Sequence, residues 1–250
     1  MAPVTPLTTF NSSRLTRFLA DLAVADVADG KQSFAERLGL WLDWKDAISL
    51  SAALNESGGR ADARLHPSSP DDALAADVAR VRRVLADSIA GDEVSGSGKA
   101  RITHPAPVAG EAPESAGDFT PYRHYHLAHQ RTMEANIVPL RARVRAALAS
   151  RSPSQSRLAA VDAALDEALR ERERRVFSMV PVLLEKHFQR LRTAHQADLA
   201  RRQEPDNPDR WMQAGGWLAR YCQDMQGALL AELDTRLQPV EGLLAALAIA

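Results

Sequence analysis

The sequence predicts an all-α protein: an elongated antiparallel bundle of long, coiled-coil-like helices, with an N-terminal helical unit and a disordered linker. Apolar residues recur at intervals of three and four through most of the 250 residues, which is the helical period. No stretch alternates apolar and polar residues with the valine and isoleucine content of a strand, so we expect no sheet. A hydrophobic content of 45% and a mean hydropathy of −0.27 predict a buried core.

Three parts are expected along the chain: an N-terminal helical unit at 1–90, a flexible linker at 91–118 and a long-helix bundle at 119–250. In the first part, a capping box beginning at Ser33 opens one helix, and Pro70 followed by two aspartates opens another. The linker is rich in glycine, proline, alanine, serine and acidic residues and has no apolar period, which is typical of a flexible segment.

The bundle part contains two long predicted helices. Thr120 and Pro121 cap the first, which starts near Tyr122. The second opens at Ser152 and continues to about Gln203, with a kink or a break at Pro181. At ~1.5 Å per residue the second helix spans ~75 Å. Because the joint at Ser150–Pro153 is short, we expect the second helix to fold back along the first.

The seam between these two helices is expected to be apolar on both sides, and a last helix, from Pro208, is expected to pack against it. A short apolar tail follows Pro239. One wall of the seam is the stripe Tyr125, His129, Met133, Ile137, Leu140, Val144 and Leu148, and the other is Leu158, Val161, Leu165 and Leu169.

Composition excludes several classes of protein. A formal net charge of −1 provides no overall attraction for nucleic acid. The single cysteine, Cys222, excludes a disulfide framework and a cysteine-based zinc site, and we expect it to be a buried, inert thiol. The apolar run after Arg14 is interrupted by Asp21, unlike a signal peptide, and no stretch reaches the ~18 apolar residues of a membrane span. We therefore expect a cytoplasmic protein.

The stretch TPYRHYHLAHQRTME (Thr120 to Glu134) gathers the most reactive side chains. On a helix, His126 and His129 share one face with two tyrosines, while His124 points the other way. Two histidines at this spacing supply half of a zinc site, but Glu134 lies about 140° round the helix from His129 and cannot complete it. We interpret the pair as hydrogen-bonded packing, with a metal site as the alternative, and expect no catalytic residue and no cofactor.

Residues 120–157 carry seven arginines and one acidic residue. Five of the arginines follow one another with no acidic residue between them, so one hypothesis is that they bind the phosphates of nucleic acid. A solvated helix face is the alternative interpretation. The five are Arg141, Arg143, Arg145, Arg151 and Arg157.

The apolar C-terminal tail has two interpretations. It docks onto a partner protein, or it covers the protein's own core. The side chains expected to make the docking contact are Leu243, Leu244, Leu247 and Ile249.

Two runs resemble an uncharacterised bacterial all-helical family, a domain of unknown function. They are YRHYHLAHQRTMEANIVPLRARVR, from Tyr122 to Arg145, and LLEKHFQRLR, from Leu183 to Arg192, and the similarity covers residues 120–240 best. The chain also resembles the accessory F component of Zorya type III antiphage systems, in which a proton-driven membrane motor acts with cytosolic partners. The resemblance implies a role in defence and assigns no catalytic residue.

From residues and resemblance together, we expect a non-enzymatic interaction subunit of an antiphage assembly, cytoplasmic and recruited to a membrane complex without spanning the membrane itself. The expected partners are the other proteins of that system. DNA bound through Arg141 to Arg157 is the alternative, and pairing with a second copy of the chain is also compatible with the pattern.

Overall fold

The computed structural model describes residue 15 and residues 44–55, 70–91, 102–108, 110 and 112–249. Within these ranges every regular element is helical and none is a strand, which confirms the predicted all-α class. The helix expected from Ser33 lies outside the described residues as far as Trp44.

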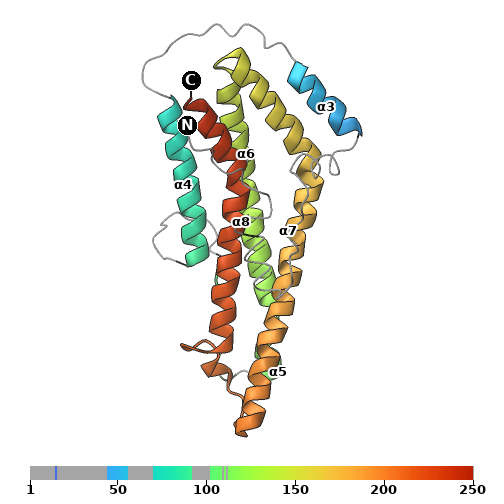
Figure 1. The fold of residues 1–250 in the computed structure, drawn as a ribbon. Coiled ribbons are helices and arrows are strands. Elements are labelled where there is room, and N and C mark those ends of the chain that lie inside the picture. Colours follow the sequence, from blue (N-terminus) through green and yellow to red (C-terminus); the bar gives the residue numbers. More distant parts are fainter. Residues whose placement is uncertain are drawn as a thin grey trace, which may run out of the picture.

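The helices form an elongated antiparallel bundle (Figure 1). Across the described part of the chain, no helix combines the length and the apolar content that a membrane span requires. The helices are α3 (Trp44–Asn55), α4 (Pro70–Ala90), α5 (Pro113–Ala116), α6 (Thr120–Ala149), α7 (Pro153–Arg202), the 3₁₀ helix η2 (Pro208–Arg210) and α8 (Trp217–Leu247).

Helices α6, α7 and α8 pack against one another along their lengths, α4 packs against α8 and α6, and α3 packs against α7 (Figure 1). The turn at 150–152 reverses the chain between α6 and α7, so these two helices are antiparallel, as the short joint predicts. The last helix begins at Trp217 rather than near Pro208, and it continues through Pro239 to Leu247. The expected separate tail is therefore the end of α8.

Helix α7 continues for 50 residues. The Ser152 hydroxyl accepts a hydrogen bond from the Gln155 amide at 3.2 Å, which satisfies one of the free N–H groups of the first turn. The helix ends at Gln203, whose φ of 54° is left-handed. Pro181 lies buried inside the helix, so the long helix is confirmed and the alternative of a break at Pro181 is wrong.

The main core lies between α6 and α8 and extends onto α4 and α7. All seven residues of the predicted α6 stripe are buried. Nearer the amino end of α8, the Phe188 ring of α7 lies 5.0 Å from the Tyr221 ring, 5.1 Å from the Trp217 ring and 5.5 Å from the Tyr122 ring, centroid to centroid. Because burying such a ring contributes roughly 1.5–3 kcal/mol, this contact holds α7 against both neighbours.

The α6–α7 seam is apolar on the α6 side only. Leu158 of α7 is 43% exposed, and Leu165 and Leu169 are only partly buried. The helix is instead turned so that Asp162 and Asp166 face α6, where they meet arginines. The predicted wall of leucines is therefore wrong, because charge pairing sets the rotation of α7 at this level.

Helix α4 and the residues just before α6 share the main core. Leu85 and Ile89 of α4 are buried in the same cluster as the α6 and α8 residues, and Ile102 packs against it. The predicted division into a unit at 1–90 and a linker at 91–118 stays a prediction. The apolar face of α4 needs a partner, and α8 provides it within one common core.

Candidate functional site

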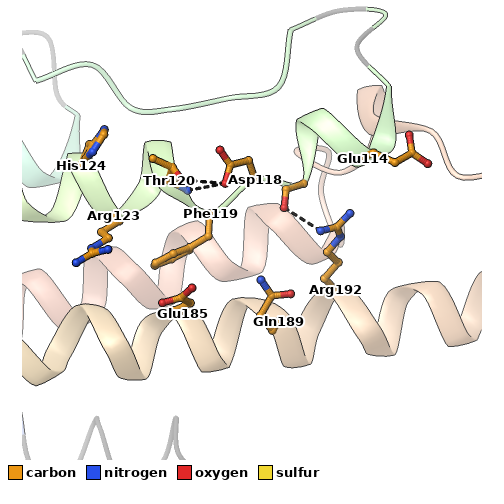
Figure 2. Close-up of a pocket in the computed structure, with 10 residues that line it drawn as sticks. Glu114, Asp118, Phe119, Thr120, Arg123, His124, Glu185, Gln189 and Arg192 are labelled. Atoms are coloured by element: carbon orange, nitrogen blue, oxygen red, sulfur yellow. Dashed lines mark hydrogen bonds between the residues drawn. The ribbon is translucent and has the colours of Figure 1, made fainter.

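The histidine–tyrosine cluster lies on the buried face of α6. Tyr122, Tyr125, His126 and His129 are 2%, 5%, 1% and 2% exposed. His124 is exposed on another side of the helix, as the helical spacing predicts, and lines an open pocket (Figure 2). The cluster is therefore part of the protein interior rather than an open cleft.

Packing leaves three of the four imidazole nitrogens of His126 and His129 without a hydrogen bond from the described residues. These are Nδ1 and Nε2 of His126 and Nε2 of His129. The Tyr125 ring packs edge-on against the His129 ring with the centroids 4.5 Å apart. The expectation that hydrogen bonds satisfy these histidines is thus wrong for His126, and a buried polar group without a partner calls for an explanation.

A fully buried carboxylate lies beside His126. Glu232 of α8 is 0% exposed and accepts hydrogen bonds from Gln130 Nε2, at 3.0 Å to each oxygen. Arg236 donates to the Oε1 atom from Nε at 2.9 Å and from Nη2 at 2.7 Å, and its guanidinium lies 3.8 Å from the centre of the Phe177 ring. The His126 Nε2 atom is 3.7 Å from Glu232 Oε2. His126, Gln130, Glu232 and Arg236 together form what we call the buried polar cluster.

Burial controls protonation in this cluster. It lowers the pKa of His126 to about 3, with smaller contributions from His129 and Arg236, and it lowers the pKa of His129 to about 4. Burial also raises the pKa of Glu232, although the Arg236 charge and the Gln130 hydrogen bond oppose that rise. At neutral pH both histidines are therefore uncharged, and Arg236 is the only residue of the buried polar cluster with a fixed positive charge.

The His126 pKa predicts a pH-dependent stability. Because the folded pKa lies below the ordinary value of 6.5, the unfolded chain takes up the proton first, and stability falls as the pH drops below 6.5 towards 3. The loss is roughly 1.4 kcal/mol per pH unit, or about 2 kcal/mol at pH 5. Urea titrations at pH 7 and pH 5 measure it. The His126→Gln variant should lose about 2 kcal/mol less stability between pH 7 and pH 5 than the original protein. Equal losses in the variant and the original protein would contradict the lowered pKa of His126.

Sequence reasoning missed most of the buried polar cluster. It located His126 but not Gln130, Glu232 or Arg236. A signal was present, because Glu232 follows Leu229 by three residues on the apolar stripe of α8, and Arg236 lies one further turn along the same face. An acid and an arginine four residues apart on such a stripe indicate a buried pair.

The structure places one additional candidate metal ligand, the Glu232 carboxylate, beside His126. Within the described residues, however, no group of three or more His, Cys, Asp or Glu side chains is arranged to hold a metal ion. Burial raises the pKa of the Cys222 thiol to about 12, so this buried sulfur is a poor nucleophile at neutral pH.

Two arginines of the candidate nucleic-acid segment are neutralised inside the protein. Arg141 bonds Asp162 at 2.6 Å and Asp166 at 2.8 Å, and Arg145 bonds the same two carboxylates at 2.7 Å and 2.9 Å. The two arginine side chains are only 14% and 21% exposed. This four-residue network ties α6 to α7 and leaves these charges unavailable to phosphates.

The other three candidate arginines lie in three different surroundings. Arg143 pairs with Asp77 of α4 at 2.9 Å, Arg151 is partly buried in the turn after α6, and Arg157 is exposed on α7. The structure therefore does not gather the five arginines into one free basic face.

The C-terminal docking candidates are divided between core and surface. Leu243 and Leu247 are 4% and 2% exposed and belong to the main core, and Leu244 packs against it. Ile249 is 84% exposed. Since α8 continues to Leu247, the tail covers the protein's own core, and the docking interpretation fails for Leu243 and Leu247.

An open pocket of about 420 Å³ lies between the start of α6 and α7 (Figure 2). Arg192 of α7 reaches across it and donates hydrogen bonds to the carbonyl oxygens of Gly117 at 3.0 Å and Pro113 at 3.4 Å. Asp118 accepts bonds from the amide and the hydroxyl of Thr120, both at 3.0 Å. These polar groups hold the ends of α5 and α6 in place.

Gly117 leaves the space that Arg192 occupies. A Cβ atom at this position would lie 2.5 Å from the centre of the guanidinium group. We expect Gly117→Ala to displace Arg192 and to lower the free energy of unfolding by about 1–2 kcal/mol. In Gly242→Ala, the matched change inside α8, the new Cβ meets nothing, and we expect a gain of about 0.5–1 kcal/mol. Urea unfolding measures both changes in the free energy of unfolding. A change of the same sign in the two variants would contradict this role of Gly117.

One segment of α7 has solvent-exposed side chains. Every residue from 170 to 176 is exposed, over about two helical turns. The apolar residues Val176, Met179 and Val182 are 52%, 52% and 40% exposed. We call these three residues the α7 surface.

The fold and these sites define the chain as an all-α bundle protein with a buried polar cluster and a partly uncovered long helix. The chain belongs to the family described as "Protein of unknown function (DUF3348)", whose model matches residues 1–249. No curated protein and no solved structure matches the chain.

Proposed function

We propose that the protein is a non-enzymatic helical subunit that binds other proteins through the middle of α7. The observation that carries the proposal is the exposure of the whole segment 170–176. A helical segment whose residues are all exposed gains no stability from burial. Its helical conformation over two turns is therefore supported by the neighbouring turns or by a partner. Next to this segment, the α7 surface offers apolar side chains beside charged ones, a combination typical of protein interfaces.

The segment has charges that suit a specific partner. Arg170 pairs with Glu167 at 2.9 Å and Arg175 pairs with Glu171 at 3.3 Å, and all four side chains are at least half exposed. Such solvated pairs contribute little to stability, so they are free to exchange for contacts across an interface.

The test uses the proteins encoded next to this gene, co-produced with the full-length chain. A photo-crosslinking amino acid at Met179 should form adducts with one of them, and the same group at Val138, which is 61% exposed on α6, should not. Val176→Glu should abolish the adduct while leaving the circular dichroism spectrum unchanged. Equal adducts at both positions, or none at Met179, would count against the α7 surface.

We further propose that the assembly is an antiphage system of the Zorya type III kind, with this chain as a cytosolic subunit recruited to a proton-driven membrane motor. The support is the resemblance of the runs Tyr122 to Arg145 and Leu183 to Arg192. Deleting the gene should remove protection in a phage-plating assay, and Val176→Glu should remove it as well. If no motor genes lie beside this gene, the link to defence fails while the interaction proposal remains open to the crosslinking test.

A further inference from the structure

Pro181 interrupts the hydrogen-bond ladder inside α7, although the helix continues past it. A proline has no amide hydrogen, so residue 181 cannot donate to the Phe177 carbonyl, which is its acceptor in an uninterrupted helix. Just before it, the Ser178 hydroxyl donates to the Arg175 carbonyl at 2.8 Å. Because a side-chain bond of this kind also loosens or bends a helix, the regular ladder is disturbed twice in succession.

A side chain from α6 supplies the donor that Pro181 lacks. Gln130 Nε2 donates to the Phe177 carbonyl oxygen at 3.1 Å and to the two Glu232 carboxylate oxygens at 3.0 Å each. These three atoms are all acceptors, so the amide nitrogen of Gln130, rather than its oxygen, must face them. Glu232 of α8 thereby aims the Gln130 amide at the interrupted turn of α7.

The buried polar cluster is therefore joined to α7 as well as to α6 and α8. Arg236 donates to Glu232, and its guanidinium group lies 3.8 Å from the centre of the Phe177 ring. Residues of this cluster thus contact both the carbonyl group and the ring of Phe177. Three helices meet at a carbonyl group that a proline has left without its helical donor.

The parts of α7 on either side of this place are attached to the bundle by different means. On the amino-terminal side, Asp162 and Asp166 pair with arginines of α6, and on the carboxy-terminal side Phe188 is buried in the main core. Between these attachments, every residue from 170 to 176 is exposed. The interrupted turn at 177–181 is where α7 returns to the interior of the bundle, so its geometry sets the direction in which the helix leaves the core.

We propose that the turn from Phe177 to Pro181 is a hinge in α7, and that Gln130 holds it in one conformation by replacing the hydrogen bond that Pro181 does not donate. When the Gln130 bond is broken, the two parts of α7 bend relative to each other. The α7 surface spans the hinge, because Val176 and Met179 precede Pro181 and Val182 follows it. Bending therefore changes how these side chains are presented to a partner. That consequence rests on the proposed function, whereas the hinge itself does not.

A double-mutant cycle between Gln130 and Pro181 tests the replacement of the bond. Gln130→Leu removes the donor to the Phe177 carbonyl, whereas in Gln130→Leu/Pro181→Ala the amide of residue 181 donates to it as in a regular helix. We therefore expect Gln130→Leu to raise the equilibrium constant of unfolding roughly threefold to tenfold more in the original protein than in the Pro181→Ala background. The bonds from Gln130 to Glu232 are lost in both backgrounds, so their cost cancels. Urea unfolding measures all four proteins.

Pro139, an exposed proline inside α6, provides the matched control. Gln130→Leu and Pro139→Ala should act additively on the free energy of unfolding, because Gln130 bonds the interrupted turn of α7 and not that of its own helix. Coupling of equal size in the two cycles would show that the missing amide of residue 181 is not the cause, and it would overturn the proposal.

Distances within α7 test the hinge directly. Spin labels at Arg174→Cys and Thr193→Cys, both at exposed positions, bracket Pro181 at a helical separation of ~28 Å, with Cys222→Ala to remove the native thiol. Double electron–electron resonance should give a narrow distance distribution in the original protein and a broader or shifted one in Gln130→Leu. In Gln130→Leu/Pro181→Ala the distribution should be narrow again.

The proposal is also overturned if the cycle between Gln130 and Pro181 is additive, or if Gln130→Leu leaves the distance distribution as narrow as in the original protein. Should Gln130→Leu not fold, Gln130→Leu/Pro181→Ala is expected to fold, because residue 181 then supplies the donor. Failure of both variants to fold would count against the hinge as well. None of these measurements involves a partner protein, so they stand or fall separately from the crosslinking result at Met179.

Discussion

Arg236→Met is expected to lower the free energy of unfolding by about 3–5 kcal/mol at pH 7, because it leaves a buried carboxylate without its cation. Glu232 is 0% exposed, and Arg236 supplies two of its four hydrogen bonds and, among the described residues, the only positive charge that pairs with it. The Gln130 amide remains, but an amide does not compensate a charge in a low-dielectric interior. Urea unfolding followed by far-UV circular dichroism measures the loss.

The matched control replaces both charges with apolar residues of similar size. In Glu232→Leu/Arg236→Met no uncompensated charge remains, so we expect most of the lost stability to return. The comparison separates the requirement for charge pairing from simple packing. If the double variant is as unstable as Arg236→Met alone, the damage lies in the lost contact with Phe177 instead.

Deleting residues 240–250 is expected to lower the free energy of unfolding by about 5 kcal/mol or more. The deletion removes Val240, Leu243 and Leu247, which are 0%, 4% and 2% exposed, and the loss of a single buried leucine side chain costs about 2–5 kcal/mol. It also removes the Ala246 carbonyl that accepts a 2.9 Å hydrogen bond from the Gln155 side chain. Thermal melts by circular dichroism measure the effect.

A shorter deletion of residues 249–250 is the matched control. Ile249 is 84% exposed, so we expect a melting temperature close to that of the full chain. The longer deletion also breaks the ion pair of Arg82 with Glu241, which joins α4 to α8. A chain ending at 239 that melts like the full-length protein would return the tail to its alternative role as a partner-docking segment.

The α6 stripe was predictable because it follows from local geometry alone. Residues three and four apart share a helix face, and a face carrying Met133, Ile137 and Leu140 must be covered. The length of α7 was predictable for the same reason, together with the Ser152 cap. Whether Pro181 would interrupt α7 was harder to judge, because the effect of an internal proline depends on whether packing compensates for the lost hydrogen bond.

The candidate sites were less predictable, because they depend on which residues meet across helices. The sequence displays Arg141 and Arg145 as part of a basic run, and only the antiparallel pairing of α6 with α7 brings Asp162 and Asp166 against them. His126 is visible as a buried candidate, but its neighbour Glu232 is about a hundred residues away in the chain. The relative rotation and sliding of helices are set by many weak contacts at once, which no local pattern specifies.

The sequence by itself therefore determined the helices and their apolar faces, since both follow from spacing along one chain segment. Only the tertiary structure decided that α4 joins the same core and that the end of α8 is buried rather than free. The physical reason is that burial and charge neutralisation are properties of surfaces in contact, and the contacts join residues far apart in the chain.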